Sequence, residues 1–128
     1  MTAPETLAVL AGHKFANLTT FRKTGQEVVT PVWFAQDGEK IYVMTMGSAG
    51  KVKRLRNNPA ARLAPSDRAG KPLGAQVGVH GRLLTPEESA TARRALDAKY
   101  GLMKKLFDMT FAIRRAKMQQ VYLEFTAS

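Results

Sequence analysis

Six short stretches rich in β-forming residues, each bounded by turn signals, constrain the fold of this chain most strongly. They cover residues 14–21, 27–35, 40–45, 60–65, 74–84 and 119–126, and Asp37-Gly38 between the second and third is a typical hairpin turn. Six short strands with few helices favour a small closed barrel, because closure removes exposed strand edges. We therefore predict a mainly β fold in which residues 1–128 form a single domain.

Helical patterns interrupt the strands at three places. Residues 4–12 predict a short N-terminal helix, and residues 49–57 predict a short basic helix. A longer helical insertion is expected at about residues 86–117, where Thr85 and Glu88 form the pattern of a capping box. Gly101 divides this insertion into two pieces, and the second has an apolar face suited to core or subunit contacts.

The charge balance restricts the classes of partner. The chain has 20 Lys and Arg residues against 10 Asp and Glu, a formal net charge of +10. This excess favours anionic partners, which include nucleic acid, acidic lipid surfaces and polyanionic small molecules. Cysteine is absent, which excludes disulfides and thiolate metal sites, and His13 and His80 lack any metal-ligand pattern. We predict no metal site and interpret both histidines as ordinary structural or surface residues.

No segment resembles a targeting signal or a membrane span. The residues before the first apolar run lack a basic region, and no apolar run approaches the roughly 20 residues that cross a bilayer. The expectation is a soluble, cytoplasmic protein.

The segment from Thr45 to Pro59 is the best local indication of function. Small residues at 47–50 are followed by four cations within residues 51–56. Tight backbone turns, a helix N-terminus, a lysine and an arginine together suit a bound phosphate. The pattern is not a Walker loop. The alternative is a solvated helix that packs only Leu55 inward, and the local sequence leaves both interpretations open.

Pro31 is unusual within the second predicted strand. Proline cannot donate a hydrogen bond to a strand ladder, so this position indicates a strand edge, a bulge or a ligand nearby.

These motifs in this order resemble the pyridoxamine 5′-phosphate oxidase-like split-barrel superfamily. The most specific pieces are T-P-V-W at residues 30–33 and K-x-K-R-L-R-x-N-P at residues 51–59, preceded by L-T-T-F at 18–21 and followed by G-R-L-L at 81–84. Within the superfamily, the chain is most similar to the branch that uses the deazaflavin coenzyme F420. The resemblance covers about residues 5–126.

The resemblance implies a six-stranded split β-barrel of the FMN-binding type that forms a homodimer with two cofactor sites at the subunit interface. It implies that residues 50–56 hold the cofactor phosphate, that residues 30–33 lie along the deazaflavin ring, and that residues 74–76 approach from the partner subunit. The cofactor-binding residues that it implies are Thr30, Pro31, Val32, Trp33, Thr45, Gly50, Lys51, Lys53, Arg54, Arg56, Ala75 and Gln76.

The activity implied by the resemblance is hydride transfer between reduced coenzyme F420 and an unidentified conjugated organic substrate, with no side chain assigned a catalytic role. The first alternative is an FMN-dependent oxidase or reductase of the same fold. The others are a non-catalytic cofactor carrier and a basic nucleic-acid-binding barrel. The sequence disfavours nucleic acid, because the aromatic residues are spread over separate strands without a K/R-G-F-type cluster.

Overall fold

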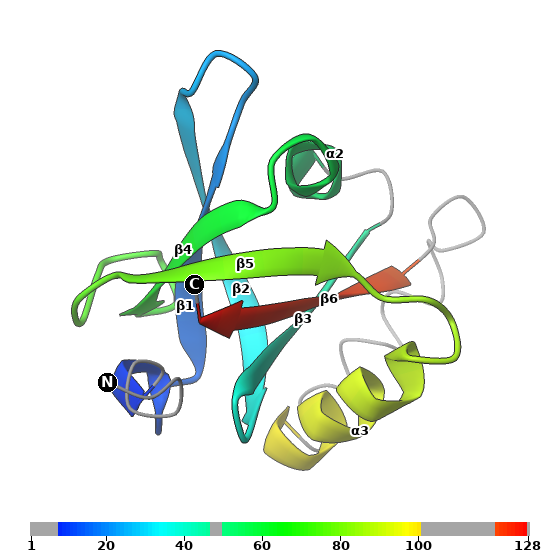
Figure 1. The fold of residues 1–128 in the computed structure, drawn as a ribbon. Helices are drawn as coiled ribbons and strands as arrows, with labels where there is room; N and C mark the ends of the chain where they lie inside the picture. The colour runs from blue at the N-terminus through cyan, green and yellow to red at the C-terminus, as the bar shows by residue number, and fades with distance from the viewer. Residues whose placement is uncertain (1–7, 47–49, 101–119, 128) are drawn as a thin grey trace.

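The computed structural model describes residues 8–46, 50–100 and 120–127, in which six antiparallel strands close into a barrel (Figure 1). Around the barrel the strand order is β1-β2-β3-β6-β5-β4. In chain order the elements are η1 (Ala8–Leu10), β1 (Phe15–Phe21), β2 (Glu27–Asp37), β3 (Lys40–Met46), α2 (Gly50–Asn57), β4 (Ala60–Ser66), β5 (Val77–Leu83), α3 (Ser89–Tyr100) and β6 (Gln120–Ala127). The predicted six-stranded, mainly β fold is confirmed.

The barrel interior is filled by alternate residues of the strands, as the period of two requires. Its most deeply buried side chains include Leu18 on β1, Phe34 on β2, Ile41 on β3 and Phe125 on β6, none more than 1 % exposed. A second apolar cluster lies between the outer surface of the sheet and α3, where Leu96 and Tyr100 pack against Tyr42 and Tyr122.

The two strands beside β2 pair with different halves of it. The whole of β1 pairs with β2 from Phe15↔Trp33 to Phe21↔Glu27, whereas β3 pairs only with the later part, from Phe34 to Asp37. In the described structure, residues 27–33 therefore have a strand neighbour on one side only, and the β1–β2 hairpin extends beyond the barrel (Figure 1). Pro31 lies in this half of β2, so the structure supports the strand-edge explanation for it.

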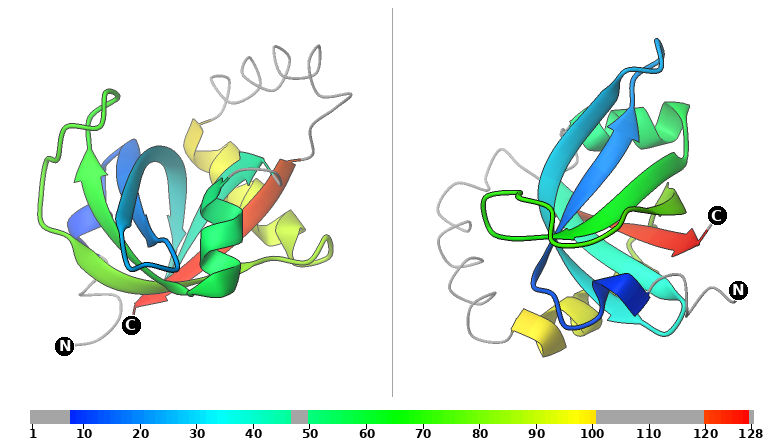
Figure 2. Two further views of the ribbon diagram at one scale, coloured as in Figure 1. Left: turned by 90° about the horizontal axis from the view of Figure 1, so that it is seen from above. Right: turned by 90° about the vertical axis from the view of Figure 1, so that its left-hand side faces the viewer.

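Helices lie at both ends of the barrel. The hairpin tip and α2 share one end, and η1 and α3 share the other (Figure 2). The predicted capping box precedes α3: the Glu88 N–H donates to Thr85 Oγ1 (3.3 Å), and the Thr85 N–H donates to Glu88 Oε1 (3.0 Å). Within the residues that the structure describes, no helix is long and apolar enough to cross a membrane.

Three predicted elements differ from the structure or extend outside the described residues. β5 begins at Val77 rather than at residue 74, because the Leu73 N–H donates to the Pro65 carbonyl (2.8 Å) and closes a loop ahead of the strand. Of the predicted N-terminal helix, residues 8–12 are described, and they form the 3₁₀ turn η1 followed by a turn that ends the helix at Leu10. The second half of the helical insertion, residues 102–117, lies outside them.

Candidate functional site

The helix α2 is fixed to the barrel by its apolar face. Val52 and Leu55 are 2 % and 5 % exposed, and α2 packs on β1 and β5. Gly81 of β5 allows this close approach, since a Cβ atom there would lie 3.2 Å from Leu55 Cδ2. The packing therefore holds the backbone of the α2 cations at this end of the barrel.

Two of these cations reach threonine hydroxyls of the strands. Lys51 Nζ donates to Thr45 Oγ1 of β3 at 3.1 Å, and Arg54 Nε donates to Thr20 Oγ1 of β1 at 2.6 Å. Burial, and secondarily the neighbouring Arg54, lowers the pKa of Lys51. Burial, and secondarily Arg22, lowers the pKa of Arg54. Both shifts indicate positive charge held partly out of water and close to other positive charge.

A cavity of about 490 Å³ opens between α2 and the β1–β2 hairpin. We call it the basic cavity. Figure 2 shows the two elements side by side at this end of the molecule. Among the described residues, those that line the cavity include four cations and no acid; they are Arg22, Lys23, Thr24 and Gln26 from the hairpin, and Gly50, Lys53, Arg54 and Asn57 from α2.

The cations of this region have no carboxylate partners within the described residues. The ion pairs among the described residues lie elsewhere, and they join Glu27 to Arg62, Glu88 to Arg82, and Glu124 to both Arg82 and Lys40. The positive charge around α2 is therefore uncompensated by the described part of the chain, which is the electrostatic condition for binding an anion.

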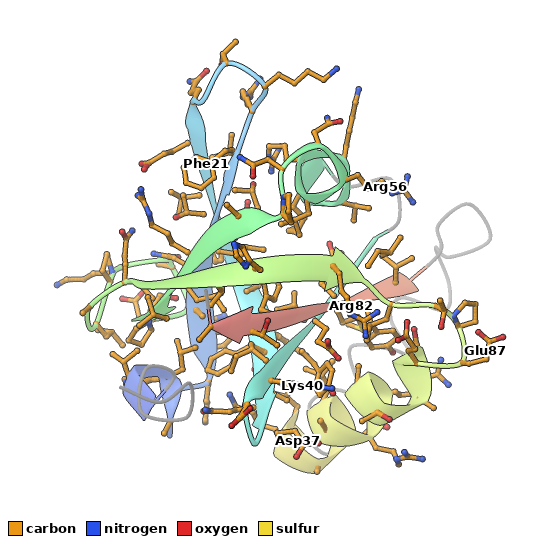
Figure 3. The ribbon with its side chains drawn as sticks, viewed as in Figure 1. Phe21, Asp37, Lys40, Arg56, Arg82 and Glu87 are labelled. Carbon is orange, nitrogen blue, oxygen red and sulfur yellow. The ribbon has the colours of Figure 1, made fainter. Side chains whose placement is uncertain are left out.

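The structure brings together one group of the predicted site residues. Gly50, Lys53 and Arg54 line the basic cavity, and Lys51 joins Thr45 beside Arg54. Arg56 is exposed, does not line the cavity, and points away from the hairpin in Figure 3.

A second group, residues 30–33, lies on β2. Pro31 is exposed opposite Asn17, and Val32 packs into the barrel core. Thr30 is partly exposed, and Trp33 stacks on Tyr100 of α3 with ring centroids 4.9 Å apart. This segment combines an open backbone edge with an aromatic ring whose position is fixed by α3.

Ala75 and Gln76 form the third group. Both are exposed and precede β5, at the end of that strand away from α2 (Figure 1). Within one copy of the chain they do not line the basic cavity.

Sequence reasoning missed Arg22, Lys23 and Thr20. Arg22 and Lys23 are adjacent cations at a predicted turn, which is a weak signal because charged turns are common. Thr20 lies in a predicted strand and gave no indication of its contact with Arg54. Within the described residues, no group of three His, Asp or Glu side chains is placed to hold a metal ion.

Comparison with known proteins agrees with this architecture. Residues 2–127 match the family model described as pyridoxamine 5′-phosphate oxidase. No curated protein matches the chain by sequence.

Several solved structures share the fold at low sequence identity. The chain is similar to the heme storage protein HutZ from Vibrio cholerae (16 % identity, 98 % of this chain and 89 % of that one, TM-score 0.69). It is also similar to an FAD-binding protein from Mesorhizobium loti (18 %, 100 % and 89 %, TM-score 0.65). A heme binding protein from Mycobacterium smegmatis matches as well (20 %, 98 % and 51 %, TM-score 0.65). Because the family model covers almost the whole sequence, this chain belongs to the pyridoxamine 5′-phosphate oxidase family.

Proposed function

We propose that the protein is an oxidoreductase that binds coenzyme F420 and transfers a hydride between the reduced deazaflavin and a conjugated organic substrate. The observation that carries the proposal is the basic cavity, a space of about 490 Å³ whose described lining residues include four cations and no acid. Membership of the pyridoxamine 5′-phosphate oxidase family supports a cofactor-binding role for this chain.

The donor set suits a phosphate-bearing ligand. Arg54 offers a planar fork, Lys51 and Lys53 offer ammonium groups, and Gly50 begins a helix whose N-terminal dipole favours negative charge. Burial, and secondarily repulsion from a neighbouring arginine, lowers the pKa values of Lys51 and Arg54, and an anion bound here would favour the charged form of both. These residues would hold the phosphate of the cofactor.

Arg22 and Lys23 extend the positive charge beyond the helix. They line the cavity from the hairpin side, so a ligand there meets cations from two elements. Coenzyme F420 carries a phosphodiester and a tail of several glutamates, and is therefore a stronger polyanion than FMN. The two-sided arrangement and the net charge of +10 favour the more highly charged cofactor.

The chemistry of hydride transfer belongs to the deazaflavin when it is bound. The residues of this chain bind and orient it. Thr45 and Thr20 fix Lys51 and Arg54 through their hydroxyls, and the half of β2 from Thr30 to Trp33 would lie beside the ring. No side chain is proposed to act as a nucleophile or a metal ligand in this hydride transfer.

A second copy of the chain would complete the site. Residues 27–33 have an open strand edge in the described structure, and Val29 is 54 % exposed there. We propose a homodimer that covers this edge and brings Ala75 and Gln76 of one subunit toward the cofactor of the other. Light scattering should show a dimer that Val29→Glu dissociates and that Gln26→Glu, in the same hairpin, leaves intact. A monomeric parent protein would contradict this part of the proposal.

FMN is the second candidate cofactor. Its terminal phosphate could use the same cations, and the structurally similar Mesorhizobium loti protein is described as FAD-binding. The other alternative is a cofactor carrier without enzymatic turnover. The structurally similar heme storage and heme binding proteins support this alternative. A hydride-transfer assay with bound cofactor separates a carrier from an enzyme.

The phosphate assignment is tested by Lys51→Ala combined with Arg54→Ala. Each substitution removes a charge-assisted contact that contributes about 1.5–3 kcal/mol, so the double variant should lose several kcal/mol of binding free energy for coenzyme F420. The matched control is Arg68→Ala with Lys71→Ala, which removes the same charge from an exposed loop. Unchanged binding by the first variant, or an equal loss in the control, would refute the assignment.

A further inference from the structure

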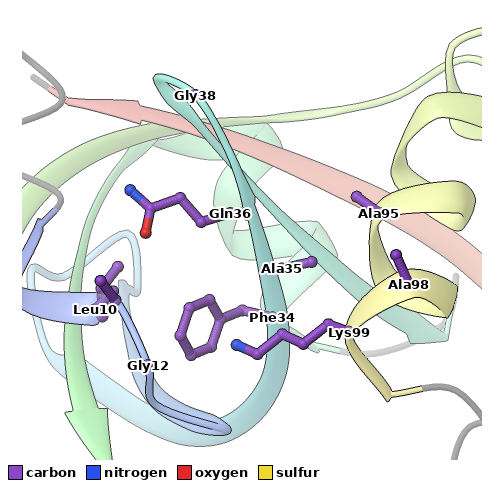
Figure 4. Close-up of a pocket in the computed structure, with 10 residues that line it drawn as sticks. Leu10, Gly12, Phe34, Ala35, Gln36, Gly38, Ala95, Ala98 and Lys99 are labelled. Carbon is purple, nitrogen blue, oxygen red and sulfur yellow. The ribbon is translucent and has the colours of Figure 1, made fainter.

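A second, larger cavity lies at the opposite end of the barrel from α2. It has a volume of about 690 Å³ and is bounded by the segment after η1, by β2 and by α3 (Figure 4). Among the described residues that line it, Lys99 is the only charged one. Nothing in the proposed cofactor chemistry uses this cavity.

The Lys99 side chain crosses from α3 to β2 and ends over an aromatic ring (Figure 4). Its Nζ lies 3.4 Å from the centroid of the Phe34 ring and 5.4 Å from that of Tyr100. Within the described residues it has no ion pair with a carboxylate. The amine therefore lies against an aromatic ring and has no counter-ion among the described residues.

This environment changes the chemistry of the amine. Partial burial lowers the pKa of Lys99 to about 8. Relative to a lysine with an ordinary pKa near 10.4, this gives roughly 200-fold more of the neutral, nucleophilic form at pH 7.

The surroundings of Lys99 leave room for a small molecule. The cavity is lined near α3 by Ala95 and Ala98, and on the other side by Ala11, Gly12 and Gly38. These residues have little or no side chain, and they offer no acidic group that would restore a counter-ion. An apolar group attached to the Lys99 amine could occupy this space without displacing the barrel core.

We propose that Lys99 is a carbonyl-capture site at which its amine condenses reversibly with small apolar aldehydes held in this cavity. The lysine nitrogen attacks the carbonyl carbon, a C–N bond forms, and water leaves with the carbonyl oxygen to give an imine. No electrons are exchanged, and hydrolysis restores the free lysine. The site is separate from the basic cavity and does not depend on the proposed cofactor.

The test is reductive trapping at pH 7 with hexanal or acetaldehyde and cyanoborohydride, followed by peptide mass spectrometry. Lys40, which is exposed like Lys99 but forms an ion pair with Glu124, provides the reference rate within the same molecule. Lys99 should be labelled by hexanal at least about tenfold faster than Lys40. The ratio of hexanal to acetaldehyde labelling should also be higher at Lys99 than at Lys40, because Lys99 lines this mostly apolar cavity and Lys40 does not.

Two variants distinguish the role of the Lys99 amine from the role of the cavity beside it. Lys99→Arg keeps the charge and should abolish the adduct at this position. Ala98→Phe keeps the amine but fills the cavity, so the hexanal preference at Lys99 should fall to that of Lys40. Equal labelling of Lys99 and Lys40, or a hexanal preference that Ala98→Phe leaves unchanged, would overturn the proposal.

Discussion

Replacing Gly81 by alanine would test how the barrel core holds the basic helix in place. A Cβ atom at Gly81 would lie 2.8 Å from Cδ1 of Phe125, closer still to its Cε1, and 3.2 Å from Cδ2 of Leu55. Carbon atoms pack best at about 3.5–4.0 Å, so the Phe125 ring would have to move by roughly 1 Å. Phe125 is fully buried, and overpacking of this kind typically costs about 1–3 kcal/mol.

Urea unfolding followed by the fluorescence of the single tryptophan measures this cost. Gly78→Ala, at an exposed position of the same strand, is the matched control and should change the free energy of unfolding little. In a Phe125→Leu background the cost of Gly81→Ala should be smaller, because the clashing ring is gone. The reasoning fails if Gly81→Ala alone leaves stability within about 0.5 kcal/mol of the parent.

Two further predictions concern α3. Tyr100→Phe should lower the free energy of unfolding by about 1–3 kcal/mol, because the hydroxyl accepts from the buried Phe34 N–H at 2.8 Å. Tyr122→Phe should cost less in the same urea titration, since that hydroxyl contacts Arg93 Nε at 3.4 Å; equal costs would contradict the argument. Hydrogen bonds from the Arg82 guanidinium and then the Thr85 N–H lower the pKa of Glu88 to about 2. The ionised Glu88 carboxylate therefore stabilises the folded state at pH values above its pKa in the unfolded chain, and this stabilisation is lost as the pH falls toward 2. The gap in melting temperature between the parent and Glu88→Gln should therefore narrow from pH 5 to pH 2, and a constant gap would refute this.

The strands were predictable because their signals are local. The turn at Asp37-Gly38, where Gly38 has φ 61°, and the capping box at Thr85 and Glu88 depend on residues close together in the chain. The late start of β5 was not predictable in this way. It depends on a hydrogen bond between Leu73 and Pro65, on opposite sides of a loop.

The candidate site likewise divides into residues that local sequence indicates and residues that only tertiary structure brings together. Lys51 and Arg54 were found because several cations follow a cluster of small residues within one short segment. Arg22 and Lys23 were missed because only tertiary structure folds the β1–β2 hairpin beside α2. The resemblance that named Lys51 could not show that its amine is held by a threonine hydroxyl, which depends on the register of β3 in the barrel.

The proximity of cations in the basic cavity also predicts how binding responds to salt. Lys53 is exposed, whereas Lys51 and Arg54 are partly buried. Screening acts mainly on exposed charges, so added salt should weaken the contribution of Lys53 more than that of Lys51. Titrations of coenzyme F420 against Lys53→Ala and Lys51→Ala at low and high salt measure this, and binding to Lys53→Ala should be less sensitive to salt than binding to Lys51→Ala. Equal salt dependence of binding in the two variants would contradict the prediction.

The most direct test of the proposed function is a fluorescence titration of the purified protein with oxidised coenzyme F420, with FMN titrated in parallel. We predict micromolar or tighter binding of the deazaflavin, corresponding to about 8 kcal/mol or more, and much weaker binding of FMN. A preference for FMN would assign the protein to flavin chemistry, and failure to bind either cofactor would contradict the proposed oxidoreductase function.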